Sequence, residues 1–182
     1  QLVVLGDPGA GKSTTLWKLA ADYAQLAVDD PKQPLPVFLR LGGLDAITDV
    51  RSAIQAQLGD ISLDALLEQK RVALLIDGLN ELPEAGRDHK IEEIRTLVKQ
   101  AQGDNLIAVV TCRELDYIED VDLNIKEQVH ITPLDPNRIR EFCHRHLPED
   151  GDMLFWGLLG QDADAVKRFW EAWQQEEKGN FL

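Results

Sequence analysis

LVVLGDPGAGKST, residues 2–14, is the stretch of sequence that decides the fold. Its apolar start predicts a buried strand, and the glycine-rich segment after it predicts a loop that leads into a helix. Backbone N–H groups can turn toward phosphate oxygens where Cβ atoms are absent, and a helix N-terminus adds partial positive charge. We therefore predict a phosphate-binding loop of the Walker A type. It comprises Gly6, Asp7, Pro8, Gly9, Ala10, Gly11, Lys12, Ser13 and Thr14.

Two side chains of this loop carry its charge and metal chemistry. Lys12 is expected to reach the β- and γ-phosphates of a nucleoside triphosphate, and Ser13 offers a hydroxyl that Mg²⁺ takes as a ligand. A glycine-rich turn without a ligand is the alternative. The strand before the loop and the helix after it favour the phosphate loop. That helix is predicted from an apolar face formed by Leu16, Leu19, Ala20, Tyr23 and Ala27.

Composition and charge limit the class of protein. With 182 residues, 44% of them hydrophobic, the chain can bury one substantial core, and we expect a single domain. The formal net charge of −13 argues against a nucleic-acid surface, because phosphate backbones require clustered Lys and Arg. The sequence has neither an apolar run of about 18 residues nor a basic leader before an apolar segment. It therefore predicts no membrane span and no signal peptide.

The cysteines and the chain ends lead to two further expectations. Cys112 and Cys143 lie in apolar surroundings, on a predicted strand and a predicted helix, which favours buried thiols and a reducing, cytoplasmic compartment. The chain begins inside a strand without an initiator Met and stops just after an amphipathic segment. We therefore expect a domain excised from a longer multidomain protein.

The remaining strands and helices predict the architecture. Strands are expected at residues 35–41, 72–76, 106–110 and 129–131, and helices near residues 48–58, 62–70 and 91–101. Strands separated by helices imply right-handed crossover connections. The prediction is an α/β fold: a three-layer sandwich with a five-stranded parallel core sheet.

Residues 134–182 are expected to form a helical extension beyond this core. Asp135 and Pro136 are expected to cap a helix. Its shared face is predicted to contain Ile139, Phe142, Cys143 and His146. A second face farther on is predicted to contain Val166, Phe169, Trp170 and Trp173. Core packing is the favoured interpretation of these aromatic side chains.

Asp77 directly follows the apolar run of residues 72–76. Its carboxylate should therefore emerge at the C-terminal edge of the sheet, where α/β folds place ligands. Together with the loop it would complete a site for Mg²⁺ and phosphate, with Asp77 associated with the metal through water. Capping of the next turn is the alternative role for this residue.

The segment LIDGLNEL, residues 75–82, resembles the extended Walker B segment of NACHT NTPases, a branch of the STAND signal-transduction ATPases. In that family a small residue follows the metal-associated Asp, and further acids come three and four positions after it. Gly78 matches the small residue and Glu81 the second acid, whereas Asn80 replaces the first. The loop at residues 6–14 is also typical of the family.

Two other segments carry the same resemblance. TCR, residues 111–113, resembles the family's sensor segment, whose Arg lies near the γ-phosphate. LDP, residues 134–136, is similar to the start of the helix that follows the last core strand. The family's strand order would place the strand ending at Thr111 between those carrying the loop and Asp77. This implies the strand order 5-1-4-3-2.

The resemblance also implies roles for Arg113 and Glu81. Arg113 would sense the third phosphate through a charge-assisted hydrogen bond that forms with ATP and is lost with ADP. A salt bridge to Glu114 or Asp116 is an open alternative for this side chain. Glu81 is the candidate for positioning the attacking water, since phosphoryl transfer demands chiefly alignment and charge neutralisation. Hydrolysis is expected to be slow because an amide, as in Asn80, cannot accept a proton.

The function implied by the resemblance is an ATP-binding and slowly hydrolysing switch of a NACHT-type signalling regulator. Its nucleotide state, ATP or ADP, would decide whether attached sensor and effector parts assemble. The resemblance also implies a helical lid and a winged-helix part elsewhere in the parent chain, and a homo-oligomer. Among bacterial members, defence is a common role.

Three other functions remain open at this stage. A metabolic phosphotransferase, such as a small-molecule kinase, also uses a phosphate loop, but no obvious Arg-rich lid is present. A GTPase would carry an Asn-Lys-x-Asp sequence, which is not found. A nucleotide-binding scaffold that does not hydrolyse is kept open by Asn80.

Overall fold

The computed structural model describes residues 1–101, 107–118, 121–132, 134–159, 164–165, 167–168 and 171–172. The chain divides into two compact units, residues 1–132 and residues 133–182, and each is described by itself. Within the described ranges, no helix has both the length and the apolar character that a membrane span requires.

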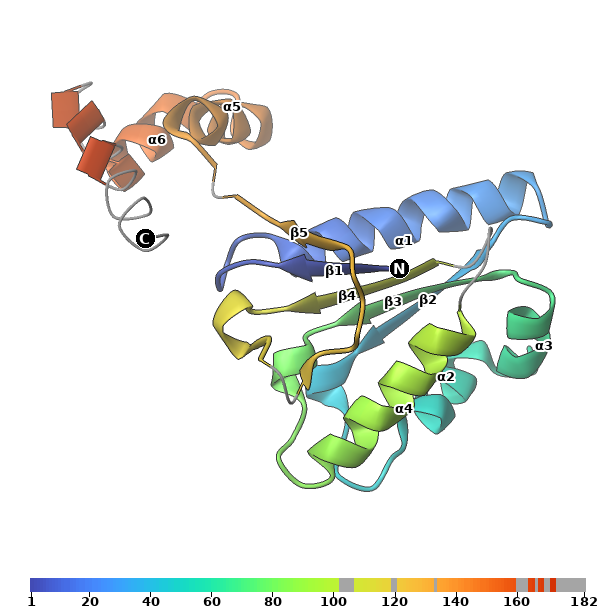
Figure 1. Cartoon of the computed structure of the whole chain (residues 1–182). Helices are drawn as coiled ribbons and strands as arrows, with labels where there is room; N and C mark the ends of the chain where they lie inside the picture. Colours follow the sequence, from blue (N-terminus) through green and yellow to red (C-terminus); the bar gives the residue numbers. More distant parts are fainter. Residues whose placement is uncertain are drawn as a thin grey trace. The chain divides into compact units, whose positions relative to one another are not determined.

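The first unit is built on one parallel sheet with helices on both faces (Figure 1). Among the described residues the sheet has five strands in the order β2-β3-β4-β1-β5, and each neighbouring pair is parallel. This is the predicted order, in which β4 lies between β1 and β3. The strands are β1 (Leu2–Leu5), β2 (Leu35–Arg40), β3 (Val72–Asp77), β4 (Ile107–Cys112) and β5 (Gln128–His130).

Helices and short 3-10 turns connect these strands. In Figure 1, α1 lies over one face of the sheet, and α2 and α4 lie over the opposite face. The helices of this unit are α1 (Lys12–Asp29), α2 (Val50–Leu58), α3 (Leu63–Glu68) and α4 (Arg87–Gln100). The 3-10 turns are η1 (Leu41–Gly43), η2 (Leu79–Glu81) and η3 (Glu114–Asp116). Each turn follows a strand at its C-terminal end, so the turns gather at one edge of the sheet.

The alternation of side chains along the strands creates two apolar layers. Val4, Leu75 and Val109 point to the face covered by α1 and pack against its buried Leu16. Their neighbours in the strands point to the other face and join the larger core with α2, α3 and α4. All residues of β3 are buried, so this strand holds Asp77, its last residue, in a fixed place.

Most observed boundaries differ from the predicted ones by one or two residues, but α4 begins at Arg87, four residues before its predicted start at Ile91. The strand predicted at residues 72–76 includes Asp77, and the one predicted at residues 35–41 ends at Arg40, because Leu41 begins η1. The strand predicted at residues 129–131 is observed one position earlier. Leu106, the predicted start of another strand, lies outside the described residues.

The second unit contains α5 (Pro136–His146) and α6 (Gly151–Leu159). Asp135 caps α5, and its Oδ1 accepts a hydrogen bond from the backbone N–H of Arg138 at 2.9 Å. The buried Cys143 of α5 packs against the buried Phe155 of α6, with Ile139 beside them. The two helices therefore share a small apolar core.

The apolar face predicted for α5 is only partly correct. Phe142 is 55% exposed and His146 is also exposed, and their rings contact each other with centroids 4.4 Å apart. The reason is geometric, because α6 covers the stripe of α5 that contains Ile139 and Cys143, and Phe142 lies to one side of it. The second predicted face, formed by Val166, Phe169, Trp170 and Trp173, lies outside the residues whose side chains are described.

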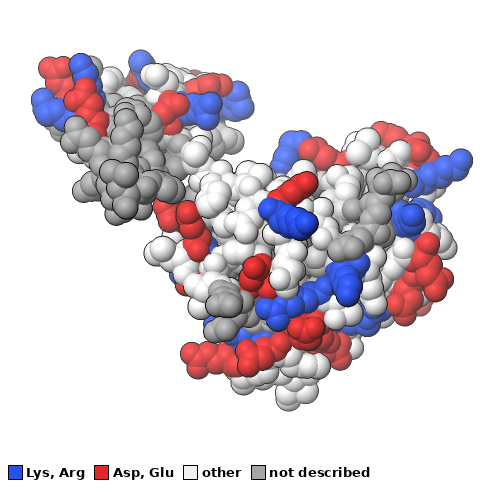
Figure 2. All heavy atoms as spheres, in the orientation of Figure 1, with Lys and Arg blue, Asp and Glu red and all other residues white. Residues whose placement is uncertain are grey.

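Charged side chains of both signs are interspersed on the face of the molecule seen in Figure 2. Local ion pairs also form along the helices, such as Lys18 with Asp22 on α1 and Arg95 with Glu92 on α4. These pairs are largely exposed and contribute roughly 0–1 kcal/mol each to stability. Fold stability therefore comes chiefly from the two apolar layers.

Candidate nucleotide site

A cavity of about 300 Å³ lies at the C-terminal ends of β1, β3 and β4. Parallel strands deliver their C-terminal ends to the same sheet edge, which brings together segments far apart in sequence. The cavity is lined by Pro8, Gly9, Gly11, Lys12, Ser13, Thr14, Asp77, Gly78, Asn80, Glu81, Thr111 and Arg113. Gly6, Asp7 and Ala10 belong to the same loop but are not among these lining residues. The other predicted site residues therefore meet around one cavity.

The loop before α1 takes its shape from two glycines. Gly9 has φ +81° and Gly11 has φ +96°, both in the left-handed region that side chains disfavour. A Cβ atom at either position would meet nothing within 4 Å, so conformation rather than space explains these two glycines. The N–H of Ala10 donates to the carbonyl of Asp7 at 3.1 Å, which closes the turn between them.

Gly6 serves a different purpose from the other two glycines. A Cβ atom there would lie 3.4 Å from the Cβ of Ala10 and 3.4 Å from the carbonyl oxygen of Ile131. The loop thus packs closely against the residue that follows β5. In addition, the N–H of Ile131 donates to the carbonyl of Leu5 at 2.8 Å. These contacts fix the beginning of the loop against the sheet edge.

Lys12, the first residue of α1, reaches back over the loop. Its Nζ donates hydrogen bonds to the carbonyl oxygens of Gly6 at 2.7 Å and Asp7 at 2.9 Å. The ammonium group is therefore held on the inner side of the loop. Ser13 and Thr14 follow in the first turn of the helix, where both residues are exposed beside the cavity. The loop and the first turn of the helix therefore line one cavity with residues that carry an ammonium group and two hydroxyl groups.

Asp77 is buried at the end of β3 and is oriented by Thr111 of β4. Thr111 is fully buried, and its Oγ1 donates to Oδ1 of Asp77 at 2.7 Å. The same hydroxyl oxygen accepts from the backbone N–H of Gly78 at 2.8 Å. Sequence reasoning used Thr111 only as part of a motif and missed this role. A polar residue at the end of an otherwise apolar strand is the signal that could have found it.

We expect Thr111→Val to destabilise the fold by about 1–3 kcal/mol, because the isosteric side chain leaves the Gly78 N–H and the Asp77 carboxylate without their buried partner. Urea unfolding of the two proteins measures the difference. Thr111→Ser retains the hydroxyl and should lose clearly less stability. Equal losses in the Val and Ser variants would show that packing of the methyl group, not the hydrogen bonds, matters at this position.

Asn80 connects the segment after β3 to the segment after β4. Its Oδ1 accepts a hydrogen bond from the backbone N–H of Arg113 at 3.1 Å. Arg113 itself is exposed and lines the cavity. Among the described residues, no carboxylate lies within ion-pair distance of its guanidinium. The amide at position 80 therefore holds the backbone from which the Arg113 side chain extends.

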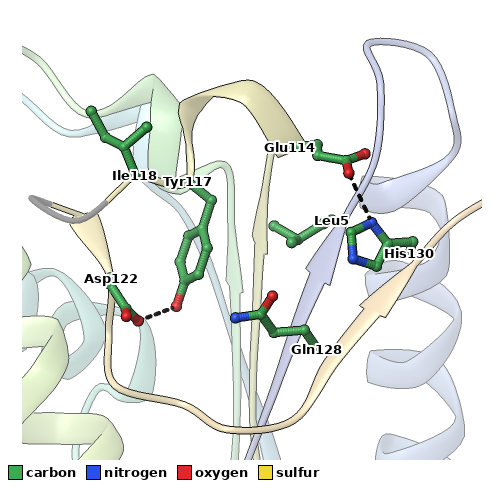
Figure 3. Close-up of a pocket in the computed structure, with 7 residues that line it drawn as sticks. All are labelled: Leu5, Glu114, Tyr117, Ile118, Asp122, Gln128 and His130. Atoms are coloured by element: carbon green, nitrogen blue, oxygen red, sulfur yellow. Dashed lines mark hydrogen bonds and ion pairs between the residues drawn. The ribbon is translucent and has the colours of Figure 1, made fainter. Parts of the chain in front are cut away.

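Glu114, one of the two open partners for Arg113, instead pairs with His130 of β5. Its Oε1 lies 3.3 Å from Nδ1 of His130, and Figure 3 shows the two side chains pointing toward each other. This pair borders a second cavity of about 310 Å³. Tyr117 and Asp122 also line this cavity, and the Tyr117 hydroxyl donates to Oδ1 of Asp122 at 2.9 Å (Figure 3). Burial raises the pKa of Tyr117 to about 12. The pairing of Glu114 removes one alternative to a phosphate-facing Arg113.

Glu81 reaches the cavity from the end of η2. Its side chain passes between Gly42 of η1 and Gly78, and its Oε2 lies 3.9 Å from Nε of Arg40 at the end of β2. The backbone N–H of Glu81 donates to the carbonyl of Gly78 at 2.8 Å, which closes the turn. A carboxylate thus lines the same cavity as the phosphate loop.

Cys112 ends β4 next to Arg113, and its side chain is fully buried. Burial, with a smaller effect of Asp116, raises the pKa of its thiol from 9.0 to about 11. The unfolded chain therefore loses this proton at lower pH than the folded protein. The resulting stability is fully present below pH 9.0 and is lost as the pH rises toward about 11.

We expect the wild-type protein to lose more stability than Cys112→Ala when the pH is raised from 8 to about 10.5, since only the wild type has the Cys112 thiol to deprotonate on unfolding. Urea unfolding at the two pH values measures this. Other groups contribute equally to both proteins and cancel in the comparison. Parallel losses in the two proteins would mean that the Cys112 proton does not differ between folded and unfolded states.

Comparison with known proteins adds one finding. The family model described as NACHT domain matches residues 1–150, which is more than half of the chain and includes every segment that lines the first cavity. A search of curated proteins gave no match. NACHT domains are nucleotide-binding modules of the STAND type of NTPase. By this match, the chain belongs to the NACHT domain family.

Proposed function

We propose that this domain binds ATP together with Mg²⁺ and hydrolyses it slowly, so that the nucleotide state switches a signalling protein. The observation that supports this most is the first cavity, where the glycine loop, two carboxylates and one guanidinium meet. Each of these groups has a use in phosphoryl transfer, and no single one of them would be informative alone. The nucleotide-binding family of the chain supports the same proposal.

The loop of residues 6–14 would hold the phosphates. The left-handed glycines Gly9 and Gly11 shape the turn before α1 and line the cavity. Their backbone N–H groups and the N-terminus of α1 would bind the phosphate oxygens. Lys12 would exchange the carbonyls of Gly6 and Asp7 for oxygens of the β- and γ-phosphates. Both arrangements satisfy the same ammonium donors, so the exchange costs little hydrogen bonding.

The residues present fit a magnesium ion. Mg²⁺ prefers oxygen ligands, usually one or two from the protein, with the rest from phosphates and water. Ser13 supplies a hydroxyl and Asp77 a carboxylate beside the same cavity. Thr111 fixes the Asp77 carboxylate through Oδ1. Ser13 would bind the metal directly and Asp77 through water, and the bound metal would neutralise phosphate charge.

Arg113 and Glu81 would act on the γ-phosphate end of the nucleotide. Hydrolysis forms a bond from a water oxygen to the γ-phosphorus and breaks the bond to the bridging oxygen, which leaves with its electron pair on ADP. The Glu81 carboxylate would orient that water and take up its proton. Arg113 would hold the γ-phosphate and lose this partner when phosphate departs.

Asn80 supports slow turnover and keeps a second candidate function open. Its amide accepts from the Arg113 backbone and has no capacity to take a proton. Besides Asp77, the segment after β3 therefore brings one carboxylate to the cavity, from Glu81, where the family has two further acids. If that carboxylate does not act on water, the domain is a nucleotide-binding scaffold without hydrolysis.

The wider role that we propose follows from the family. Attached sensor and effector parts of a longer protein would respond to whether ATP or ADP occupies the domain, with defence as one setting. Residues 134–182 would be a helical extension toward a lid in the longer protein. A homo-oligomer formed in the ATP state belongs to the same proposal.

Calorimetric titration of ATP, ADP and GTP with and without Mg²⁺ tests the proposal, followed by phosphate release from the same samples. We expect adenine nucleotides to bind more tightly than GTP and Mg²⁺ to strengthen ATP binding. A slow but measurable release of phosphate supports the switch, and binding without release supports the scaffold. Failure of all three nucleotides to bind would refute both.

A further inference from the structure

Glu81 lies in a notch formed by two glycines from different parts of the chain. A Cβ atom at Gly42 would overlap Oε2 of Glu81 and lie 3.1 Å from its Cβ. A Cβ atom at Gly78 would lie 3.0 Å from the carboxyl carbon of the same residue. The Glu81 side chain thus occupies the space that side chains at these positions would fill.

The backbone on both sides of the notch is firmly anchored. Leu41, the first residue of η1, and Leu79, the first residue of η2, are fully buried in the main core. Each 3-10 turn is closed by its own backbone hydrogen bond, from Leu44 to Leu41 and from Glu81 to Gly78. A larger residue at Gly42 would therefore displace chiefly the movable carboxylate of Glu81, while its 3.1 Å approach to the Glu81 Cβ requires a shift of only a few tenths of an ångström between the two turns.

The ion pair with Arg40 contributes less to this placement than the notch. Nε of Arg40 lies 3.9 Å from Oε2 of Glu81, and the two side chains are 63% and 39% exposed. At that distance and exposure, an ion pair contributes little. Steric contact with Gly42 and Gly78 is short-ranged and unaffected by solvent, so it defines the carboxylate position more narrowly.

We infer that Gly42 is a positioning residue for ATP hydrolysis: its missing side chain creates the notch that holds the Glu81 carboxylate at the phosphate cavity. This inference rests on the proposed role of Glu81. Gly42 does not line the cavity, so it acts through Glu81 rather than on nucleotide. The structure thereby assigns part of the hydrolytic machinery to the turn after β2.

The chain offers a matched pair of variants. Gly42→Ala puts a methyl group into the notch, whereas Gly43→Ala adds the same group one residue later, where nothing lies within 4 Å. Neither glycine has a positive φ, so alanine fits both backbones. We expect Gly42→Ala to slow single-turnover hydrolysis at least about tenfold, because small displacements of a catalytic group are costly. ATP affinity should change less than about twofold, and Gly43→Ala should behave as wild type.

Two further measurements show whether the effect passes through Glu81. In the Glu81→Gln background, Gly42→Ala should cause no additional slowing, since the group that it displaces is no longer a base. The carboxyl ¹³C resonance of Glu81, assigned by its loss in Glu81→Gln, should shift in Gly42→Ala and stay in place in Gly43→Ala. An unmoved resonance, or equal slowing in both backgrounds, overturns the inference.

These readouts separate the inference from the proposed function. If Glu81→Gln hydrolyses ATP as fast as the wild type, the proposed role of Glu81 fails, and the positioning role of Gly42 in hydrolysis fails with it. The resonance still reports whether Gly42 places the carboxylate. If Glu81→Gln is slow and Gly42→Ala is not, the proposed function stands and only the inference is refuted.

Discussion

Replacement of Lys12 by alanine is expected to weaken ATP binding at least about 100-fold, because charge-assisted hydrogen bonds to two phosphates are worth roughly 3 kcal/mol or more together. The ammonium group sits over the loop at 2.7 Å from the carbonyl oxygen of Gly6 and 2.9 Å from that of Asp7. It is therefore already held beside the backbone that we propose to bind phosphate. Calorimetric titration of ATP with Mg²⁺ into both proteins measures the change.

Lys18→Ala is the matched control, because Lys18 lies on the same helix and pairs with Asp22 one turn away. It removes the same charge from α1 and should leave ATP affinity within about twofold of wild type. Circular dichroism checks that both variants keep their helices. Unchanged ATP affinity in Lys12→Ala would contradict the phosphate loop itself and, with it, the whole nucleotide site.

Glu81→Gln is expected to slow ATP hydrolysis about 100-fold, the lower end of the range for loss of a catalytic base. The amide has the same shape as the carboxylate, so it still fits between Gly42 and Gly78. ATP affinity should therefore remain close to that of the wild type. Single-turnover phosphate release at saturating ATP, together with calorimetry, separates the rate from the affinity.

A carboxylate nearby in sequence provides the control for this second variant. Glu84 is exposed and follows η2 by three residues, but it does not line the cavity. Glu84→Gln removes one negative charge from the same region and should hydrolyse ATP at the wild-type rate. If Glu81→Gln and Glu84→Gln are equally fast, Glu81 has no part in the chemistry.

Much of the sheet could be predicted from local patterns. Continuous apolar runs such as residues 72–76 indicate strands buried on both faces, and the strand–loop–helix pattern at residues 2–14 indicates the start of the fold. The strand order depends on the resemblance to the family, because periodicity describes single elements and not their neighbours. The observed order agrees with it.

The contacts that shape the site could not be predicted in the same way. Gly42 and Glu81 meet because two parallel strands, β2 and β3, end side by side, and no local pattern records such a meeting. In the sequence, Thr111 is an ordinary β-branched strand residue, and only the structure shows that its hydroxyl donates a hydrogen bond to Asp77. Long-range hydrogen bonds and steric notches depend on the assembled sheet.

The sequence also does not show which of several nearby side chains a charged or aromatic residue contacts. The sequence could not decide whether Arg113 pairs with Glu114, since the two are adjacent and opposite in charge. The structure pairs Glu114 with His130, a residue 16 positions later that the sequence analysis did not connect to it. Likewise, the exposed position of Phe142 depends on which stripe of α5 is covered by α6.

The shortness of β5 has a mechanical consequence for the whole chain. This edge strand has three residues, all exposed, and pairs only with β1 among the described strands. The Glu114 to His130 ion pair across it is about half exposed and worth roughly 0–1 kcal/mol. Two residues after β5 the first unit ends. The chain therefore reaches the second unit through β5, which can separate from β1 while β4 keeps its pairing with β1 and β3. A pulling force on the second unit can then be taken up at β5 without breaking the rest of the sheet that carries the phosphate loop.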